Sequence, residues 1–387
     1  EIAQCLVGSE MCIRDRYRMK FSCSQQTLTK ALNIVSKAVT IRTTIPILKG
    51  ILLKVNENNV LTMSASDLDL SIEKKIKVEN SQPGEIVVLS KLFGDIIKKL
   101  PDGEITIEEN DGKVNIKCSN SEFNIIGLSA DEFPNINPNE ENSEELVFNK
   151  ELLKDMIKKT AFAASIDENK GAMTGVLIEM DENSLNMVTI DGFRMAIARE
   201  QMKNKKQQNI IIPAKILSEI SRIITETEVS GDDVTMLLSE KKAVFMMENT
   251  KVVIRLLDGE FMNYKRIIPA ENPCRVVLNR NDFLESVERA SLLAKVGKNN
   301  LVKLEIKDNN IEITSKSEEG NVKEDIIVSK EGNDLIIGFN SKYLIDVLKV
   351  IDDESISMYF NTNVSPCLVK PIDGNLSLIH ISEPTRH

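Results

Sequence analysis

Apolar residues recur along the chain at the spacing of one buried helix face. Leu28, Leu32, Val35 and Val39 follow one another at intervals of four, three and four residues, which is the periodicity of an amphipathic helix. Two further segments repeat these intervals, at separations of 125 and 130 residues: Leu153, Ile157, Thr160 and Ala164, and Phe283, Val287, Ala290 and Ala294. The pattern predicts three copies of one helix in a repeated architecture.

A second helix marker recurs with the same period. Lysine is the second residue of three similar segments, at Lys91, Lys215 and Lys342, which lie 124 and 127 residues apart. In each segment apolar residues follow the lysine directly and return one turn later. Two independent markers with one period make chance a poor explanation, so we predict three domains with two helices each.

Short alternations of apolar and polar residues between the helices predict strands, for example at 51–55, 61–64 and 114–117. Turn-forming pairs such as Asp111–Gly112 separate them. The chain is therefore predicted to be α+β, with three repeated domains, each with two helices packed on antiparallel sheets. Polar and proline-rich segments place these domains at 19–142, 143–271 and 272–375.

The two ends fit neither pattern. Residues 1–18 and 376–387 show no helical stripe and no clean alternation, whereas Met19 opens a plausible start. One short oligonucleotide can encode CLVGSEMCIRD, and its reverse complement can encode LSLIHISEPTRH. We interpret both ends as translated adapter read-through, that is, as non-native tails.

Composition narrows the chemistry. The chain has a formal net charge of −10, no tryptophan and only two histidines, His380 and His387. Because both lie in the last eight residues, the body has no imidazole for a catalytic triad or a metal site. The six cysteines show no CxxC spacing, so we expect no metal, no cofactor and a reduced cytosolic protein. No apolar run approaches the ~18 residues of a membrane helix, so we expect no membrane partner.

Acidic pairs leave one enzymatic interpretation open. Asp67–Leu68–Asp69, Asp232–Asp233 and Asp352–Asp353 could each bind Mg²⁺. The first is expected within an alternating strand, and no glycine-rich phosphate loop accompanies any of them. We therefore expect no catalysis. Tight binding of a divalent ion with hydrolysis of a nucleotide or nucleic acid would favour the enzyme.

Basic residues gather in the predicted helices. The segments 25–39, 90–100, 149–165, 213–224, 280–298 and 341–351 are each net positive and together carry +9, which leaves −19 for the rest of the chain. Lysines commonly lie on the exposed face of a single helix without any binding role. Six positive segments in an acidic chain, however, indicate a surface that binds a polyanion weakly.

Several motifs, taken in order, resemble one known family. They are MKFSCSQQTLTKAL at 19–32, TIPIL at 44–48, SDLD at 66–69, ADEFP at 130–134, TIDGFRMA at 189–196 and YKRIIP at 264–269. With the threefold repeat, they resemble the bacterial DNA polymerase III beta subunit, the beta sliding clamp family, over essentially all of 19–375. The resemblance implies the DNA clamp fold, closing as a dimeric six-domain ring.

A ring of this kind implies a non-catalytic processivity factor. It would encircle duplex DNA without sequence specificity and tether the replicative DNA polymerase as part of the polymerase III holoenzyme. The resemblance also implies a cytoplasmic, nucleoid-associated bacterial homodimer. Its further partners would be the clamp loader and repair proteins, bound through short peptides containing Leu and Phe.

Three sets of residues are expected to carry this function. The DNA surface comprises Arg42 and Lys170, which the resemblance implies, and the helix residues Lys30, Lys37, Lys91, Lys98, Lys154, Lys158, Lys215, Arg222, Arg289, Lys342 and Lys349. The resemblance implies a peptide pocket of Met173, Gly192, Phe193, Arg194, Met195, Met262, Arg266, Ile267, Val364 and Pro366. It also implies a dimer interface of exposed apolar residues at Phe123, Ile125, Leu292 and Leu293.

The chain departs from the family pattern at two points. Met262 stands where the family commonly has proline, and the family's final strand is missing after Asn375. We therefore expect an incomplete peptide pocket and an unpaired edge in the last sheet. One alternative keeps the fold and the pocket but not the ring, namely a repeat-built adaptor that binds proteins and never encircles DNA.

Overall fold

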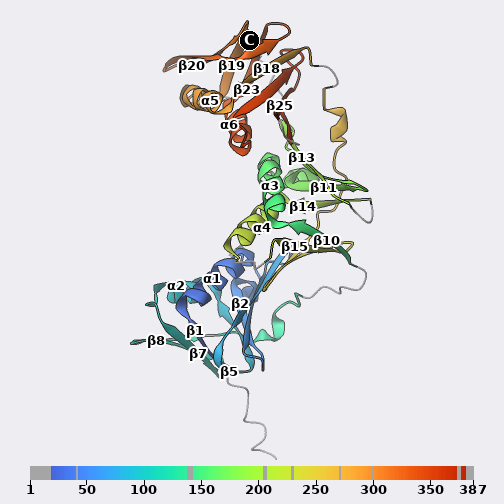
Figure 1. Ribbon diagram of the computed structural model, residues 1–387. Coiled ribbons are helices and arrows are strands. Elements are labelled where there is room, and N and C mark those ends of the chain that lie inside the picture. Colours follow the sequence, from blue (N-terminus) through green and yellow to red (C-terminus); the bar gives the residue numbers. More distant parts are fainter. Residues whose placement is uncertain are drawn as a thin grey trace, which may run out of the picture. The chain divides into compact units, whose positions relative to one another are not determined.

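Figure 1 shows the computed structural model of the chain. It describes residues 19–40, 42–136, 143–203, 207–227, 231–269, 272–297 and 300–372, and the backbone of 376–380. The chain forms two compact units. Of the described residues, the first unit comprises those up to Lys150 together with those of Arg222–Arg255, and the second comprises those of Glu151–Ser221 together with those from Leu256 onward.

Two antiparallel sheets form the first unit. The five-stranded sheet has the order β5 (Glu79–Gln82), β1 (Lys20–Ser24), β7 (Glu104–Asn110), β8 (Lys113–Cys118) and β9 (Ser121–Ile126). The eight-stranded sheet has the order β10 (Glu144–Asn149), β15 (Asp233–Leu238), β16 (Lys242–Met247), β17 (Thr250–Arg255), β4 (Leu70–Lys77), β3 (Val60–Ser66), β2 (Gly50–Val55) and β6 (Gly84–Leu89).

Two more antiparallel sheets form the second unit. The nine-stranded sheet has the order β14 (Gln208–Pro213), β11 (Gly175–Asp181), β12 (Ser184–Ile190), β13 (Arg194–Gln201), β26 (Leu376–His380), β25 (Cys367–Pro371), β24 (Ser355–Phe360), β18 (Cys274–Asn279) and β22 (Ser329–Glu331). The four-stranded sheet has the order β21 (Gly320–Ile327), β20 (Asn310–Ser317), β19 (Leu301–Lys307) and β23 (Leu335–Asn340).

Six α-helices lie within the described residues: α1 (Gln25–Val35), α2 (Ser90–Lys99), α3 (Lys150–Thr160), α4 (Ala214–Glu226), α5 (Arg280–Ala294) and α6 (Ser341–Val350). Side-chain caps fix several of their starts, as where Ser24 accepts from the Thr27 N–H and Asn340 from the Lys342 N–H. The helices lie in pairs, α1 beside α2 and α5 beside α6 (Figure 1).

The predicted helix faces are confirmed, but two of the three helices are shorter than predicted. Phe283, Val287, Ala290 and Ala294 are all buried on α5, and the matching residues of α1 and α3 are buried as well. Val39 and Ala164 are the exceptions, because α1 ends at Val35 and α3 at Thr160, and in each case a short 3₁₀ turn precedes the last residue of the stripe, which is extended. The three helices that begin near Lys91, Lys215 and Lys342 are confirmed as α2, α4 and α6.

The prediction that every helix is net positive is wrong. As folded, α4 carries Lys215 and Arg222 against Glu219 and Glu226 and is neutral. Likewise α5 carries two arginines against three acidic residues. The predicted segments ended elsewhere than the helices do, so they omitted Glu226 and included Lys295 beyond α5. A positive balance remains on α1, α2, α3 and α6.

The expectation of an unpaired edge in the last sheet is also wrong. β26 pairs antiparallel with β25 on one side and with β13 on the other. All five residues of β26 pair with β13, and three of them pair with β25, so this segment continues the ladder where we expected it to stop. The predicted strands at 51–55, 61–64 and 114–117 lie within β2, β3 and β8.

Candidate partner-binding and DNA-binding surfaces

The loop between β12 and β13 is a tight turn held by Asp191. The buried Asp191 carboxylate accepts hydrogen bonds from the backbone N–H groups of Phe193, at 2.8 Å, and Arg194, at 3.0 Å. Gly192 has a φ of 97°, a conformation that side chains disfavour. The turn directs Phe193 outward, with 43% of its surface exposed. The Asp-Gly-Phe-Arg motif thus presents an aromatic ring on a rigid turn.

The side chain of Arg194 holds this turn in place. Its guanidinium donates to Asp191 at 3.1 Å, to the Asp346 carboxylate at 2.6 Å and to the Phe162 carbonyl at 2.8 Å. It also lies over the Tyr343 ring, 4.6 Å from the centroid. The side chain is only 9% exposed. Arg194 therefore positions the β12–β13 loop against α6.

An apolar cluster lies beside the turn. Its buried members are Leu177, Val188, Ile190, Met195, Ile197, Ile211, Tyr264 and Leu368, and its half-buried members are Ala172, Met173, Leu257, Phe261, Ile267 and Tyr359. Met173, Met195 and Ile267 were expected in the peptide pocket, and the structure brings all three into this cluster. Met195 is only 1% exposed and forms part of its floor.

The remaining pocket residues lie at the surface. Met262 and Val364 are 42% and 59% exposed, Arg266 is exposed and Pro366 is half-buried. A hydrogen bond of 2.6 Å between Thr362 and Ser365 closes the loop that carries Val364. Exposed apolar side chains beside a buried apolar floor are typical of a surface that binds a peptide.

A buried carboxylate holds the linker that contributes Tyr264. Glu179 accepts hydrogen bonds from the Tyr264 hydroxyl at 2.7 Å, from Lys265 at 2.9 Å and from Asn186 at 3.0 Å. Burial alone would raise the pKa of Glu179. The hydrogen bonds from these three donors outweigh burial and hold the pKa below its usual range.

Sequence patterns did not indicate several members of this surface. Tyr264, Leu368 and Tyr359 lie on three separate segments that meet only through sheet pairing and the linker. The single available signal was the sequence motif Tyr-Lys-Arg at 264–266, which coincides with a 3₁₀ turn. It marked the linker without showing which side chain faces the cluster.

Lys170 lies with the partner-site residues. Its ammonium donates to the Asp191 carbonyl at 2.8 Å and lies 5.7 Å from the Phe193 ring centroid. We expected Lys170 at the DNA surface. These contacts bring it together with two residues of the β12–β13 loop.

Ion pairs engage several of the expected DNA-binding residues. The pairs are Lys37–Glu226 at 2.9 Å, Lys154–Glu151 at 3.0 Å, Lys158–Asp352 at 2.8 Å, Arg289–Glu324 at 2.7 Å and Lys349–Glu288 at 2.8 Å. Lys158, Arg289 and Lys349 are exposed, and exposed pairs exchange partners at little cost, so a phosphate could compete for these cations. Lys37 and Lys154 are half-buried.

Other basic residues are exposed. Lys91 and Lys98, with Ser36, Ser90 and the acidic Asp95, line a notch of about 130 Å³ between α1 and α2. Arg42, Lys30, Lys215, Arg222 and Lys342 are also exposed. Paired lysines with neighbouring hydroxyl groups in a notch on a helix pair can contact phosphate oxygens without reading bases.

The apolar residues expected at the dimer interface differ in exposure. Phe123 on β9 and Leu292 on α5 are 41% and 66% exposed, whereas Leu293 is half-buried. Ile125 is only 9% exposed, because it stands opposite the buried Val114 on β8. An exposed position for Ile125 is therefore wrong within this chain.

Two edge strands carry exposed apolar residues that sequence reasoning missed. β9 ends its sheet, as β21 ends another. Ile126 on β9 is 79% exposed and Ile327 on β21 is 90% exposed. A long edge with exposed isoleucine is a template for pairing with another strand.

Carboxylates of the three acidic pairs form hydrogen bonds or ion pairs within the fold. Asp67 lies in the turn between β3 and β4, not within a strand as expected, and its carboxylate accepts from the N–H groups of Asp69 and Leu70 at 3.1 and 2.7 Å. Asp232 and Asp352 pair with Lys150 and Lys158. Among the residues that the structure describes, no cluster of three His, Cys, Asp or Glu side chains could hold a metal ion.

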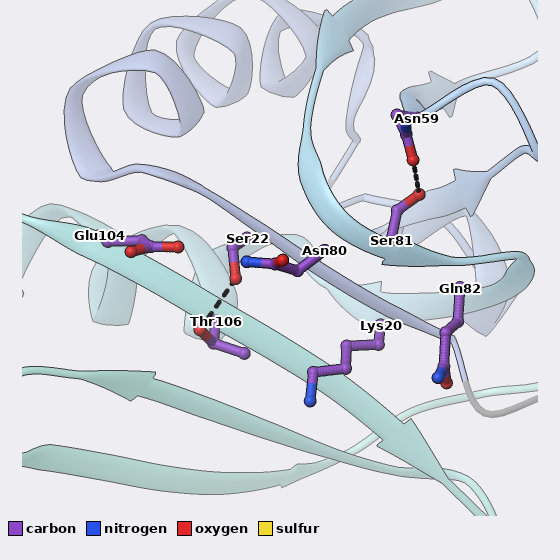
Figure 2. Close-up of a pocket in the computed structure, with 8 residues that line it drawn as sticks. All are labelled: Lys20, Ser22, Asn59, Asn80, Ser81, Gln82, Glu104 and Thr106. Carbon is purple, nitrogen blue, oxygen red and sulfur yellow. Dashed lines mark hydrogen bonds between the residues drawn. The ribbon is translucent and has the colours of Figure 1, made fainter.

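A polar depression lies on the five-stranded sheet of the first unit (Figure 2). Lys20, Ser22, Glu104 and Thr106 line it, together with Asn59 and residues 80–82. A hydrogen bond of 3.0 Å joins Ser22 to Thr106, and Ser81 donates to Asn59 at 2.6 Å. None of its lining residues was expected to bind DNA, a peptide or a second subunit.

Three protein-family models match the chain, one after another along its length. The DNA polymerase III beta subunit N-terminal, central and C-terminal domains match residues 19–137, 147–263 and 265–382. The beta sliding clamp of Bacillus subtilis is 35% identical over 366 residues, covering 91% of this chain and 96% of that protein. The beta sliding clamp of Halalkalibacterium halodurans is 36% identical and covers 95% of this chain and 100% of that protein.

Solved structures give the same result. The DNA polymerase sliding clamp of Bacillus subtilis superposes with a TM-score of 0.89 at 33% identity, covering 95% of this chain and all of that one. The DNA polymerase III beta subunit of Thermotoga maritima has a TM-score of 0.88 at 31% identity, with the same coverage. The fold is therefore the three-domain α+β clamp fold. This chain belongs to the family of bacterial DNA polymerase III beta subunits, the beta sliding clamps.

Proposed function

We propose that this chain works as a DNA sliding clamp, a processivity factor without catalytic activity of its own. The observation that carries the proposal is the threefold repeat of a helix pair on antiparallel sheets, in a chain that matches all three beta-subunit domains. A ring of such repeats links protein to DNA topologically, so it needs only weak, sequence-independent phosphate contacts.

The ring requires a second copy of the chain, joined head to tail. The free edges of β9 and β21, with Phe123, Ile126, Ile327 and Leu292 exposed, support an interface in which these edges pair across subunits. Pairing would bury the apolar residues and give partners to the edge backbone groups. Leu293, at the rim of α5, belongs to the same proposed interface.

The DNA surface in this proposal comprises the helix lysines and Arg42. Support comes from the exposed Lys91 and Lys98 at the α1–α2 notch and from Lys215 and Lys342 at the corresponding helix starts. The exposed Lys170 also belongs to the proposed DNA surface, and its contacts with Asp191 and Phe193 bring it close to the proposed partner site.

The apolar cluster and the β12–β13 loop form the proposed site for partner proteins. A replicative polymerase, clamp loader or repair protein would bind there through a short peptide with Leu and Phe, which the apolar floor and the exposed Phe193 and Met262 suit. The several methionines suit a surface that serves different partners. Arg194 is assigned a positioning role.

Three further assignments belong to this proposal. The domains span 19–142, 143–271 and 272–375. The protein is cytoplasmic and associates with the nucleoid. Among the described residues, no helix has the length and apolar character needed to span a membrane.

The proposal is tested by the topology of the DNA. The chain, loaded by a clamp loader, should stay on nicked circular DNA through gel filtration and leave after a restriction enzyme linearises it, since a ring slides off free ends. Equal retention on circular and linear DNA would contradict the ring. If the chain stays on neither circular nor linear DNA but still binds peptides, that result would favour the alternative of a protein-binding adaptor.

A further inference from the structure

The apolar cluster continues along one row of the nine-stranded sheet. Tyr359 on β24 stands directly opposite Leu368 on β25, and on its other side opposite Arg275 on β18. Directly opposed residues share a face of the sheet. Since Leu368 belongs to the buried floor and Tyr359 packs against it, this row leads from the cluster to a cation.

Two cations flank the Tyr359 ring. The Arg275 guanidinium lies 5.8 Å and the Lys370 ammonium 5.7 Å from the ring centroid. Lys370 stands opposite Ser357, two residues from Tyr359 on β24, so it lies on the same face. We call Arg275, Tyr359 and Lys370 the basic end of the cluster.

The basic end is short of negative charge. Within the part of the chain that the structure describes, Lys370 forms no ion pair, and the one carboxylate near Arg275 is Glu331 at 3.8 Å. That contact is loose, because the Glu331 side chain is 73% exposed. The Arg275 side chain is 40% exposed, and its Nη2 atom donates only a long hydrogen bond of 3.5 Å, to the Ser357 hydroxyl. The exposed part of the guanidinium can therefore accept a further partner.

We infer that the basic end binds the carboxylate of an acidic side chain in a partner peptide, next to the Leu and Phe that the apolar cluster accepts. The inference rests on the proposed function of the cluster as the partner site. Arg275 and Lys370 would supply charge-assisted hydrogen bonds, and Tyr359 would pack against the peptide's aliphatic carbons.

Continuity with the apolar floor favours a peptide over a nucleic acid. Tyr359 is shared between the floor and the cations, so a ligand must offer apolar carbon and negative charge within one short segment. An acidic residue beside Leu or Phe does so, whereas a phosphodiester backbone offers charge alone. The chain as a whole has a net charge of −10, which repels acidic ligands from most of its surface. A positive end beside an apolar surface therefore directs an acidic peptide to this one site.

Fluorescence anisotropy with synthetic peptides tests the inference on the full chain. The probes are labelled ten-residue peptides with central Leu and Phe and one Asp, or Asn in its place, at either flank. At one flank the Asp peptide should bind roughly 3- to 10-fold tighter than the Asn peptide, and the difference should shrink at high salt.

Three variants assign this preference to the basic end. Lys370→Glu should abolish the preference for Asp and favour a peptide with Lys at that flank. Glu331→Gln should tighten the Asp peptide about 2-fold by releasing Arg275, with the Asn peptide unchanged. Lys316→Glu, on the exposed side of β20, makes the same charge change elsewhere in the same domain and should alter neither.

The outcomes separate this inference from the proposed function. Binding of both peptides with equal affinity at either flank overturns the acidic subsite and leaves the partner site standing. Binding of neither peptide overturns the partner site itself. A Lys370→Glu chain that loses affinity for duplex DNA but keeps its preference for the Asp peptide would assign the basic end to nucleic acid and overturn the inference.

Discussion

The Tyr264 hydroxyl donates a hydrogen bond to the Glu179 carboxylate at 2.7 Å, and this bond ties the linker after β17 to β11. Tyr264 is 4% exposed and forms part of the apolar cluster. The proposed partner site is therefore built on a linker to which a buried carboxylate binds directly, through Tyr264.

Glu179→Gln should weaken the fold of the second unit. The amide loses the charge in its bonds with Lys265 and Tyr264, and we expect a loss of about 1–3 kcal/mol in the free energy of unfolding. Tyr264→Phe removes one donor only and should cost about 1 kcal/mol. Urea unfolding measures both changes, and an unaltered midpoint for Glu179→Gln would contradict the role of this carboxylate.

The same carboxylate predicts a dependence of stability on pH. Because the folded state holds the pKa of Glu179 below its ordinary value of 4.5, its contribution is present above that value. It is lost as the pH falls through the folded pKa. The stability of the wild-type chain should therefore fall more steeply below pH 4.5 than that of Glu179→Gln. Parallel curves would show that Glu179 is not the group responsible.

Arg194 and Asp346 should be strongly coupled. Arg194 is buried and its contact with Asp346 is 2.6 Å, so a double-mutant cycle with Arg194→Gln and Asp346→Asn should give a coupling energy of about 1–3 kcal/mol. Lys349 and Glu288 form an exposed pair on the neighbouring helices. Their cycle should give less than about 0.5 kcal/mol. Similar values for the two cycles would contradict the anchoring role.

Gly192→Ala should disturb the β12–β13 turn. At a φ of 97° a side chain costs about 1–2 kcal/mol, and relaxation of the turn would move Phe193 and weaken peptide binding several-fold. Gly94→Ala is the matched control, because Gly94 lies in α2 with open space around its Cβ position. That change should stabilise the chain by about 0.5–1 kcal/mol and leave peptide binding unaltered.

Leu292→Glu should give a monomer. A charge in an apolar interface costs several kcal/mol, so sedimentation should show half the mass of the wild-type dimer, and Leu293→Glu should reinforce the effect. Ile336→Glu is the control. Ile336 is 47% exposed on β23, the opposite edge of the sheet that ends in β21. A dimer that survives Leu292→Glu, or is lost with Ile336→Glu, contradicts the proposed interface.

Removing Lys91 and Lys98 together should reduce the salt dependence of DNA binding. Each phosphate contact contributes about 0.9 to the slope of log affinity against log salt concentration, so the double alanine variant should lose about 2 in slope. Lys113 and Lys117 on β8 provide a matched pair on a sheet of the same domain. Their replacement by alanine should leave the slope unchanged if the helices alone face DNA.

The sequence predicted the elements of the fold better than the site. Stripes such as Phe283 to Ala294 survive in the structure because helix periodicity is local. Tyr359 and Tyr264 escaped prediction because they reach the cluster only through the pairing of distant strands and the linker. The charge tally failed for α4 and α5 because it depended on where each helix ends. Arg194 could be picked out from its motif, but not its partner Asp346, 152 residues away.

The middle repeat has no sheet of its own. Its strands β10 and β15–β17 complete a sheet with β2–β4 and β6, while β11–β14 complete another with strands of the third repeat. Excised alone, this segment would bare the backbone of β17, which pairs with β4, and of β13, which pairs with β26. Two strand edges with unpaired backbone groups would make the excised segment prone to aggregate. The repeated segment of the sequence is therefore not a soluble unit on its own. Exchanging repeats among relatives should succeed only when the neighbouring strands are exchanged with them.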